Sequence, residues 1–383
     1  MKNKININIG IVGGGIASLV FANLLKNNKK FKIKIFEKNK IKTTAKTGIQ
    51  ISNNARRILN KINFNQLDKK KFCEIRKVNI SEYENKKKIS HLSMNHFNNR
   101  EEEYVSLDRN LLINFLIKQT KKKIDFCYEE VISVKKNTIY FEKKKEEKFD
   151  IVVVADGIFS KIRGGMSNYS LQKISAVAYR GVVRGYNFAN SSNVDLFLGD
   201  NKHFVFYPIN KMGDFSFTSI FSTNSNALKK DYSSISSKRE LMNMSCNANS
   251  KIKKIISLTN AIYRWPIYQQ QKIYCGKNKT FVIGDASHAM APFQAQGAAQ
   301  SIEDAFCLSQ MFKNNIFDVK YFESLRRDRV KMILEKSYKS LFIYHLNNLL
   351  TKQVRNFFIK IICKYRILSN FYFGKIYNYK FKD

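Results

Sequence analysis

Residues 7–37 read INIGIVGGGIASLVFANLLKNNKKFKIKIFE, and this stretch decides the fold. Ile7, Ile9 and Ile11 alternate with polar or small residues, which predicts a β-strand. Three glycines at 13–15 then predict a tight turn, and the apolar spacing that follows predicts a helix. A second strand at 32–36 ends in Glu37. Strand, glycine turn, helix, strand and a terminal acid together predict a dinucleotide-binding βαβ unit.

One position departs from this fingerprint, because Ser18 stands where the third glycine is usual. That glycine allows the helix to pack closely on the strand, and serine is a small replacement. A glycine-rich turn in an unrelated α/β protein is the alternative interpretation. The matching strand, helix and acid favour the dinucleotide unit.

A second informative stretch, residues 280–305, reads TFVIGDASHAMAPFQAQGAAQSIEDA. An apolar strand ends in Gly284 and Asp285, a loop carries Pro292, and Gly297 opens a helix with Ala298. The first turn of a helix presents unpaired N–H groups and positive potential, and small residues let a ligand approach the backbone. We expect a large, flat, partly anionic cofactor to lie against this helix.

The composition is that of a folded protein with an unusual charge. The chain has 383 residues, 44% of them hydrophobic, and a formal net charge of +38. This charge attracts anions, but lysine is spread through every segment, which favours a general bias in composition. We find no helix-turn-helix, zinc finger, RNA-binding signature or basic stripe, and we expect no nucleic-acid partner.

The cysteines and the apolar segments indicate in which cellular compartment the protein is expected. The six cysteines form no C-x-x-C pair and have no metal-ligand spacing, so we expect no metal site. Scattered thiols fit a reducing cytoplasm. No apolar run is long enough to cross a bilayer, so we expect no integral membrane segment.

The predicted secondary structure changes from an α/β pattern to an antiparallel sheet and then returns to the α/β pattern. Residues 149–155 predict a buried parallel strand ending in Asp156 and Gly157, and residues 170–275 predict a mostly antiparallel sheet rich in Phe and Tyr. A helix is expected from Leu107, with Ser106 or Asp108 as its cap. We divide the chain into a nucleotide-binding α/β domain (1–75, 104–168 and 276–330), an inserted sheet domain (169–275, with 76–103 as a hairpin or insertion) and a C-terminal helical segment (331–383).

Three separated motifs now stand in order: Gly13–Ser18 with Glu37, the Asp156-Gly157 segment, and Gly284-Asp285. Together they resemble the FAD-dependent aromatic monooxygenases with a single dinucleotide fold, and most closely their salicylate-hydroxylase-like branch. Smaller similarities lie at 48–55, 179–181, 203–208, 325–329 and 376–379. The resemblance implies a Rossmann-like FAD-binding domain, an inserted substrate domain and closing helices.

The resemblance implies a set of cofactor-binding residues. The glycine turn would line the adenosine diphosphate, Glu37 would hold the ribose, and Asp285 would bind the ribityl hydroxyls. Arg109 would reach the phosphates or the ribityl chain, although it can also be a solvated helix arginine. The full set expected at FAD is Gly13, Gly15, Ile16, Ala17, Ser18, Glu37, Lys38, Gly48, Arg109, Val131, Asp156, Gly157, Asp285, Gly297 and Ala298.

The same resemblance implies a reaction in which NADH or NADPH reduces FAD, and O2 then hydroxylates an aromatic ring through a flavin hydroperoxide. We nominate His203 and Tyr207 for proton transfer, because positions four apart in a strand face the same side. Tyr207 would act as a base if its pKa were lowered. Gln50 and Arg180 are further pocket candidates, Arg180 for a substrate carboxylate, and Pro292 would wall the ring. Plain sheet packing is the alternative role for His203 and Tyr207.

We expect an NAD(P)H-dependent hydroxylase of a small aromatic or phenolic substrate. A ring hydroxylase of ubiquinone biosynthesis, which would need an open apolar channel, and a non-catalytic flavoprotein remain alternatives. Phe357, Phe358, Phe371, Tyr372 and Phe373 lie among lysines near the C-terminus, a composition that also occurs at membrane surfaces. We favour self-packing or a homodimer contact for these residues.

Overall fold

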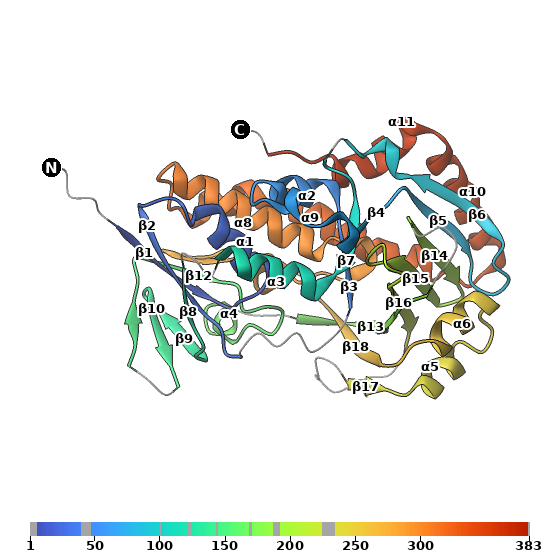
Figure 1. The fold of residues 1–383 in the computed structure, drawn as a ribbon, viewed down its shortest axis with the longest axis horizontal. Coiled ribbons are helices and arrows are strands. Elements are labelled where there is room, and N and C mark those ends of the chain that lie inside the picture. The colour runs from blue at the N-terminus through green and yellow to red at the C-terminus, as the bar shows by residue number, and fades with distance from the viewer. Residues whose placement is uncertain are drawn as a thin grey trace.

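In the computed structural model, residues 6–39, 47–99, 101–120, 124–142, 145–167, 171–186, 192–223 and 234–381 are described. The chain forms two large sheets, with a layer of helices along one side and a C-terminal helical segment at the far end (Figure 1). The predicted α/β fold with an inserted antiparallel sheet and C-terminal helices is confirmed.

The first sheet is the dinucleotide-binding one. Its order is β19-β20-β12-β1-β2-β8, and all neighbours are parallel except β19 and β20. Parallel strands are buried on both faces, which explains the unbroken apolar run of β12. The strands are β1 Ile7–Val12, β2 Phe31–Phe36, β8 Asp125–Cys127, β12 Ile151–Val154, β19 Gly276–Lys277 and β20 Thr280–Val282.

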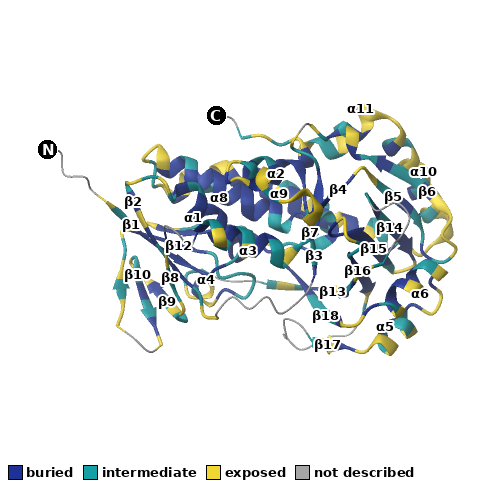
Figure 2. Cartoon of the chain, viewed as in Figure 1, coloured by how far each residue is buried: buried dark blue, intermediate teal, exposed yellow. Residues whose placement is uncertain are grey.

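Helices cover one face of this sheet. Helix α1 packs against α3 and α8, and almost the whole of α8 is buried (Figure 2). The helices are α1 Ile16–Leu25, α2 Asn53–Asn60, α3 Arg109–Thr120, α4 Lys161–Gly164, α7 Asp285–His288, α8 Gly297–Lys313 and α9 Val319–Tyr344, with 3-10 turns η1 Phe64–Gln66, η2 Lys69–Lys71, η3 Met94–His96 and η4 Pro292–Gln294.

The expected start of α3 needs correction. The structure places Ser106 and Asp108 in strand β7 (Val105–Asp108), and the helix begins only at Arg109. Asp108 nevertheless caps it, because its Oδ1 accepts a hydrogen bond from the Asn110 N–H at 2.8 Å. Strand β7 pairs with β3 (Gly48–Ile51) and β4 (Phe72–Glu74) in a small sheet. A hairpin is formed by β9 Val131–Lys135 and β10 Thr138–Phe141, with β11 Glu147–Lys148 beside it.

The second large sheet is mostly antiparallel. Its order is β17-β18-β13-β16-β15-β14-β5-β6, and only the β14–β5 pair is parallel. Phe204 stacks on Phe217, and Phe206 on Phe215, at the sheet's outer face under α5 and α6. The elements are β5 Lys77–Glu82, β6 Lys88–Ser93, β13 Leu171–Val183, β14 Asn193–Gly199, β15 Lys202–Pro208, β16 Phe215–Ser222, β17 Ser234–Ser236, α5 Lys238–Met244, α6 Ser250–Ser257 and β18 Ile262–Gln270.

The C-terminal segment lies over the β6 edge of this sheet (Figure 1). Self-packing was expected for its aromatic residues, yet Phe357, Phe358 and Phe371 are exposed. Only Phe373 among them packs against the nearby core cluster. The elements are α10 Leu349–Lys364, α11 Arg366–Ser369, the π-helical turn η5 Asn370–Gly374 and α12 Lys375–Tyr377. None of the helices within the described ranges is long and apolar enough to span a bilayer.

Candidate active site

The two glycine-bearing turns meet around one cavity between the two large sheets. The cavity has a volume of about 390 Å³. It is lined by both turns, by the inner face of the antiparallel sheet and by the first residues of α8. Most of the predicted site residues line it: Gly15, Ile16, Ala17, Gly48, Gln50, Arg109, Gly157, Arg180, His203, Tyr207, Asp285, Pro292, Gly297 and Ala298.

The first glycine turn is shaped for close approach to a ligand. Gly13 has φ +99°, and a Cβ there would lie 2.4 Å from the Ala155 carbonyl oxygen, so only glycine fits. Gly15 is different, because a Cβ at this position would meet nothing within 4 Å. The open side of Gly15 faces the cavity at the N-terminus of α1. This is the geometry that admits a phosphate group to backbone N–H groups.

The remaining residues of this turn pack inward. Ser18 is buried, and its hydroxyl donates to the Gly15 carbonyl at 3.0 Å, so serine at the third glycine position serves packing. The Glu37 Oε2 accepts from the Gly14 N–H at 2.7 Å, which places the acid beside the turn as the fingerprint requires. Lys38 is exposed, and Val131 packs in a separate cluster under β9. Neither Lys38 nor Val131 lines the cavity.

A second turn ends β12 beside the first one. Gly157 has φ +88° and lines the cavity. The neighbouring Asp156 has a buried Oδ1 that finds no hydrogen-bond partner among the residues that the structure describes. Burial raises the pKa of this carboxyl above its ordinary value, while Ser160 and Lys38 oppose the rise. An orphaned carboxylate oxygen at this position is suited to accept a hydrogen bond from a bound hydroxyl group.

Asp285 and Arg109 supply opposite charges to the cavity. The Asp285 side chain is enclosed by protein yet accessible from the cavity, since it lines that space at the start of α7. Burial raises the pKa of Asp285, and the positive charges of His288 and Arg109 counteract it. Asp285 is therefore held where it can accept from ligand hydroxyls, as predicted, and Arg109 is close enough to influence its charge.

The Gly284–Asp285 turn is anchored by a buried ionic cluster. Asp304 accepts from the Gly284 N–H at 2.8 Å and from His288 Nε2 at 2.6 Å. Arg326 donates to Asp304 at 2.7 Å and to Glu303 at 2.9 Å. Burial alone would raise the pKa of Asp304, but His288 and Arg326 lower it to about 2. His288 is therefore a buried structural residue that bonds to Asp304.

Arg163 of the short helix α4 lies behind the Asp285 turn. Its guanidinium is buried and donates to the carbonyls of Ala286, Ser287 and Lys272 at 2.9, 3.1 and 3.0 Å. These bonds hold the short helix α7 in place. Arg163 therefore acts on the Asp285 turn from behind and does not reach the cavity.

Tyr207 lies on the wall formed by the antiparallel sheet. Gly48 makes room for it, since a Cβ at Gly48 would lie 2.7 Å from Tyr207 Cε2. The lowered pKa that a base role needs is absent: burial raises the pKa of Tyr207, although Ser216, Arg180 and Gln50 act against burial. Tyr207 is therefore a neutral hydrogen-bonding hydroxyl at neutral pH. Gln50 accepts from the Tyr104 hydroxyl at 2.9 Å beside it.

Arg180 has the features of an anion-binding group. It lies over the Trp265 ring at 5.2 Å, and its Nε has no hydrogen-bond partner within the described part of the chain. Burial lowers the pKa of the guanidinium, while Tyr207 favours its charged form. A buried cation without a full set of partners is costly, and a carboxylate or phenolate in the cavity would satisfy it.

His203 leads to a second histidine that the sequence did not reveal. His203 Nδ1 lies 2.7 Å from His345 Nε2, and His345 Nδ1 lies 2.7 Å from the hydroxyl of Ser222. Burial lowers the pKa of His345 to about 4 and that of His203 well below its usual value. Because Ser222 is exposed, a chain of polar atoms runs from the cavity to the surface. His345 follows α9, 142 residues further along the chain, so no local motif could have indicated it.

Comparisons with known proteins agree with this geometry. A family model described as an FAD binding domain matches residues 141–316, and one described as an NAD(P)-binding Rossmann-like domain matches residues 11–45. Curated relatives that the chain is similar to include FAD-dependent aromatic monooxygenases such as 3-hydroxybenzoate 6-hydroxylase and salicylate hydroxylase. The residues that surround the cavity fit FAD, because the open backbone at Gly15 suits a phosphate and Asp285, which lines the cavity, suits a hydroxyl group.

The individual relatives are distant in sequence. The 3-amino-4-hydroxybenzoate 2-monooxygenase PtmB3 of Streptomyces platensis is 23% identical over 88% of this chain and 88% of that protein. The salicylate hydroxylase of Pseudomonas putida is 22% identical over 55% of each. Among solved structures, a salicylate hydroxylase substrate complex has a TM-score of 0.82 at 18% identity, covering 99% of this chain and 97% of that one. Klebsiella pneumoniae HpxO complexed with FAD and uric acid has a TM-score of 0.81 at 18% identity, with 95% of each chain covered.

Proposed function

We propose that the protein uses NADH or NADPH and O2 to hydroxylate a small aromatic or phenolic substrate. One observation carries the proposal: the FAD-binding turns and the polar group of Arg180, Tyr207 and His203 line the same cavity. Relatives named as hydroxylases of salicylate, 3-hydroxybenzoate and 3-amino-4-hydroxybenzoate support the choice of an aromatic acid or phenol. Bound at this site, FAD would supply the hydride acceptor and the oxygen chemistry.

The protein's own residues would bind and orient the substrate. Arg180 would pair with its carboxylate or phenolate oxygen, and Tyr207, neutral at physiological pH, would donate a hydrogen bond to the same group. The N-terminus of α8, beginning at Gly297, would stabilise negative charge on the cofactor. Ile220 and Val205 line the cavity beside Pro292 and would exclude water from the reacting ring.

His203 replaces Tyr207 as the residue that we assign to proton removal. The neutral imidazole of His203 would take the phenolic proton, and its Nδ1 would pass a proton to His345 Nε2, with Ser222 as the exit to solvent. We keep the proposed roles in FAD binding for the cavity-lining residues, and for Gly13, Glu37 and Asp156 in or beside the two turns. Ser18 packs inside its turn, and Lys38 and Val131 lie away from the cavity. The free thiols of the described cysteines fit a cytoplasmic location.

The test is to purify the protein with FAD and to measure NADH and NADPH oxidation in the presence of single phenols and benzoates, with product analysis. We expect one class of aromatic compound to accelerate oxidation and to be recovered with an added oxygen atom. Tyr207→Phe should lower the rate of product formation about 10- to 100-fold while FAD affinity stays unchanged, since the hydroxyl faces the substrate side. If no aromatic compound accelerates oxidation or yields product, the protein is not an aromatic hydroxylase.

A further inference from the structure

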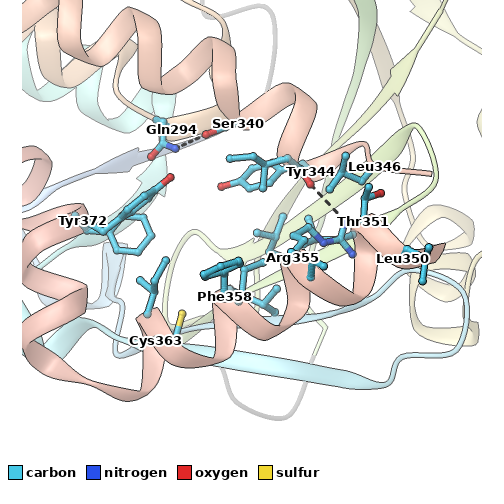
Figure 3. Close-up of a pocket in the computed structure, with 18 residues that line it drawn as sticks. Gln294, Ser340, Tyr344, Leu346, Leu350, Thr351, Arg355, Phe358, Cys363 and Tyr372 are labelled. Atoms are coloured by element: carbon cyan, nitrogen blue, oxygen red, sulfur yellow. Dashed lines mark hydrogen bonds between the residues drawn. The ribbon is translucent and has the colours of Figure 1, made fainter. Parts of the chain in front are cut away.

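A second cavity, of about 610 Å³, lies between α9, α10 and the edge of the antiparallel sheet (Figure 3). Its volume is within the range of small-molecule sites, roughly 300–1,000 Å³. Leucine, isoleucine and aromatic side chains dominate its lining, and Arg355 is the only charged residue among the described residues that line it. A cavity with this lining binds hydrocarbon and offers almost no polar partner to water.

The second cavity continues the active-site cavity along one face of the sheet. His203 and Val205 of β15 line the active site, and their directly paired neighbours on β14, Leu198 and Leu196, line the apolar cavity. Paired residues on adjacent strands point to the same face. On the next strand, β5, Ile80 pairs with Leu196 and extends the same apolar surface.

Two side chains in contact separate the cavities, because His203 lines the active site and Tyr344 lines the apolar cavity. The Tyr344 ring packs edge-on against that of His203 with 5.3 Å between centroids. Gln294, which also lines the apolar cavity, belongs to the same turn as Pro292 of the active site. The Gln294 side chain is held by a 2.5 Å hydrogen bond to Ser340 (Figure 3). A rotation of Tyr344 would join the two spaces.

We propose that the two cavities form one binding site for an aromatic substrate that carries a long hydrocarbon chain. The ring would lie beside Tyr207 and Arg180, and the chain would pass Tyr344 and lie along Leu198 and the inner side of α10. This inference rests on the proposed function and extends its substrate class, since the reacting ring is the one proposed above and the hydrocarbon chain is a substituent on that ring. The apolar cavity adjoins the active site, and this position identifies its occupant as part of the substrate. A lipid unrelated to the reaction would not need a cavity whose Tyr344 packs against His203 of the active site.

The outer rim of the cavity leaves room for a chain longer than the cavity itself. Leu350, Val354 and Phe358 line it from α10, and each is more than half exposed, so the chain can continue towards solvent between them. Arg355 beside them is buried and donates to Asn356 and to the Ile343 carbonyl, so it closes the polar side of the rim.

A chain-length series tests the proposal. With FAD-loaded protein, KM would be measured for 4-alkylphenols and 4-alkyl-2-hydroxybenzoates from ethyl to dodecyl, and binding of the same compounds would be measured by calorimetry. We expect KM and Kd to fall about fourfold per methylene that enters the cavity, the equivalent of roughly 0.8 kcal/mol each. Constant KM and Kd across both series would overturn the proposal.

Two neighbouring phenylalanines provide the matched variants. Phe358 lines the cavity and Phe357 does not, yet their exposed fractions are similar, 55% and 60%. Phe358→Asp should reduce the gain to less than twofold per methylene, whereas Phe357→Asp should keep the wild-type series. FAD loading of both variants serves as the folding control. Equal effects of the two substitutions would contradict a role for the cavity.

Further outcomes separate this inference from the proposed function and from other occupants. Chain-length-dependent binding of the phenols without any oxidation would support the cavity and refute the proposed function. Dodecanoate that binds as tightly as the phenols and does not compete with them would show a separate lipid site and overturn the assignment. Two other results would also overturn the assignment. In the first, both phenylalanine variants lose binding to anionic vesicles while the chain-length series stays unchanged, which would mean that a bilayer covers this face. In the second, both variants convert a dimer to monomers with the series unchanged, which would mean that a second copy covers it.

Discussion

The buried arginine that anchors the Asp285 turn gives a sharp test of how the site is built. Arg326 is 1% exposed and donates to Glu303, Asp304 and Gln300 at distances of 2.7–2.9 Å. The substitution Arg326→Met keeps the apolar length of the side chain and removes the charge. Asp304 would keep only His288 as a positive neighbour, and Glu303 only Arg329.

The expected loss follows from the burial of both carboxylates. Removing one partner of a buried ion pair costs about 3–5 kcal/mol, because an uncompensated charge stays in the interior. That is a large part of the roughly 5–15 kcal/mol by which domains are stable. Arg327→Met is the matched control: Arg327 is exposed and its ion pair is with Glu323, so solvent screens the pair and its loss should leave the free energy of unfolding nearly unchanged.

The measurement is equilibrium urea unfolding of the FAD-loaded variants, followed by circular dichroism. Arg326→Met should also weaken FAD binding, since Asp304 holds the Gly284 N–H. Adding Asp304→Asn should return at least about 1 kcal/mol, because the second change removes the stranded charge. A loss below about 1 kcal/mol in Arg326→Met, or equal losses in the two arginine variants, would refute the reasoning.

Three further predictions follow from the same structure. Gly15→Ala should fold normally and bind FAD at least tenfold more weakly, because its Cβ fills open space at the cavity, whereas Gly13→Ala should lower stability by about 2 kcal/mol or more through its positive φ and the Ala155 carbonyl. Thermal unfolding with and without FAD separates the two effects. Equal FAD affinities in wild type and Gly15→Ala would argue against a phosphate at this turn. The folded-state pKa of His345 is lowered to about 4 from 6.5, so the unfolded chain binds a proton first as the pH falls. The stability from this group is complete above pH 6.5 and falls by roughly 3 kcal/mol as the pH drops towards 4. Unfolding of His345→Gln across that range should show a shallower dependence of stability on pH, and an unchanged slope would mean that His345 is not the titrating group. Arg180→Gln should raise KM for benzoate substrates at least tenfold and that for neutral phenols much less, and steady-state kinetics showing equal changes would place the carboxylate elsewhere.

Local sequence was sufficient where the chemistry itself is local. Gly13 needs a positive φ and a close carbonyl, and Glu37 stands one strand beyond it, so the βαβ unit could be predicted from spacing alone. The same holds for Asp285 and Gly297, since strand end, turn and helix start are consecutive in the chain. The antiparallel sheet was predictable because its strands alternate and are rich in Phe and Tyr.

Only the tertiary structure could reveal the contacts between segments that lie far apart in the chain. His345 reaches His203 from the end of α9, and Arg326 reaches Asp304 from a neighbouring helix, and neither pairing leaves a periodic signal in the sequence. Protonation states also depend on burial: Tyr207 resembled a base in the sequence, but enclosure raises its pKa. Cavities are set by how elements pack, so the apolar space beside α10 became visible only when Leu198 and Phe358 were placed around it.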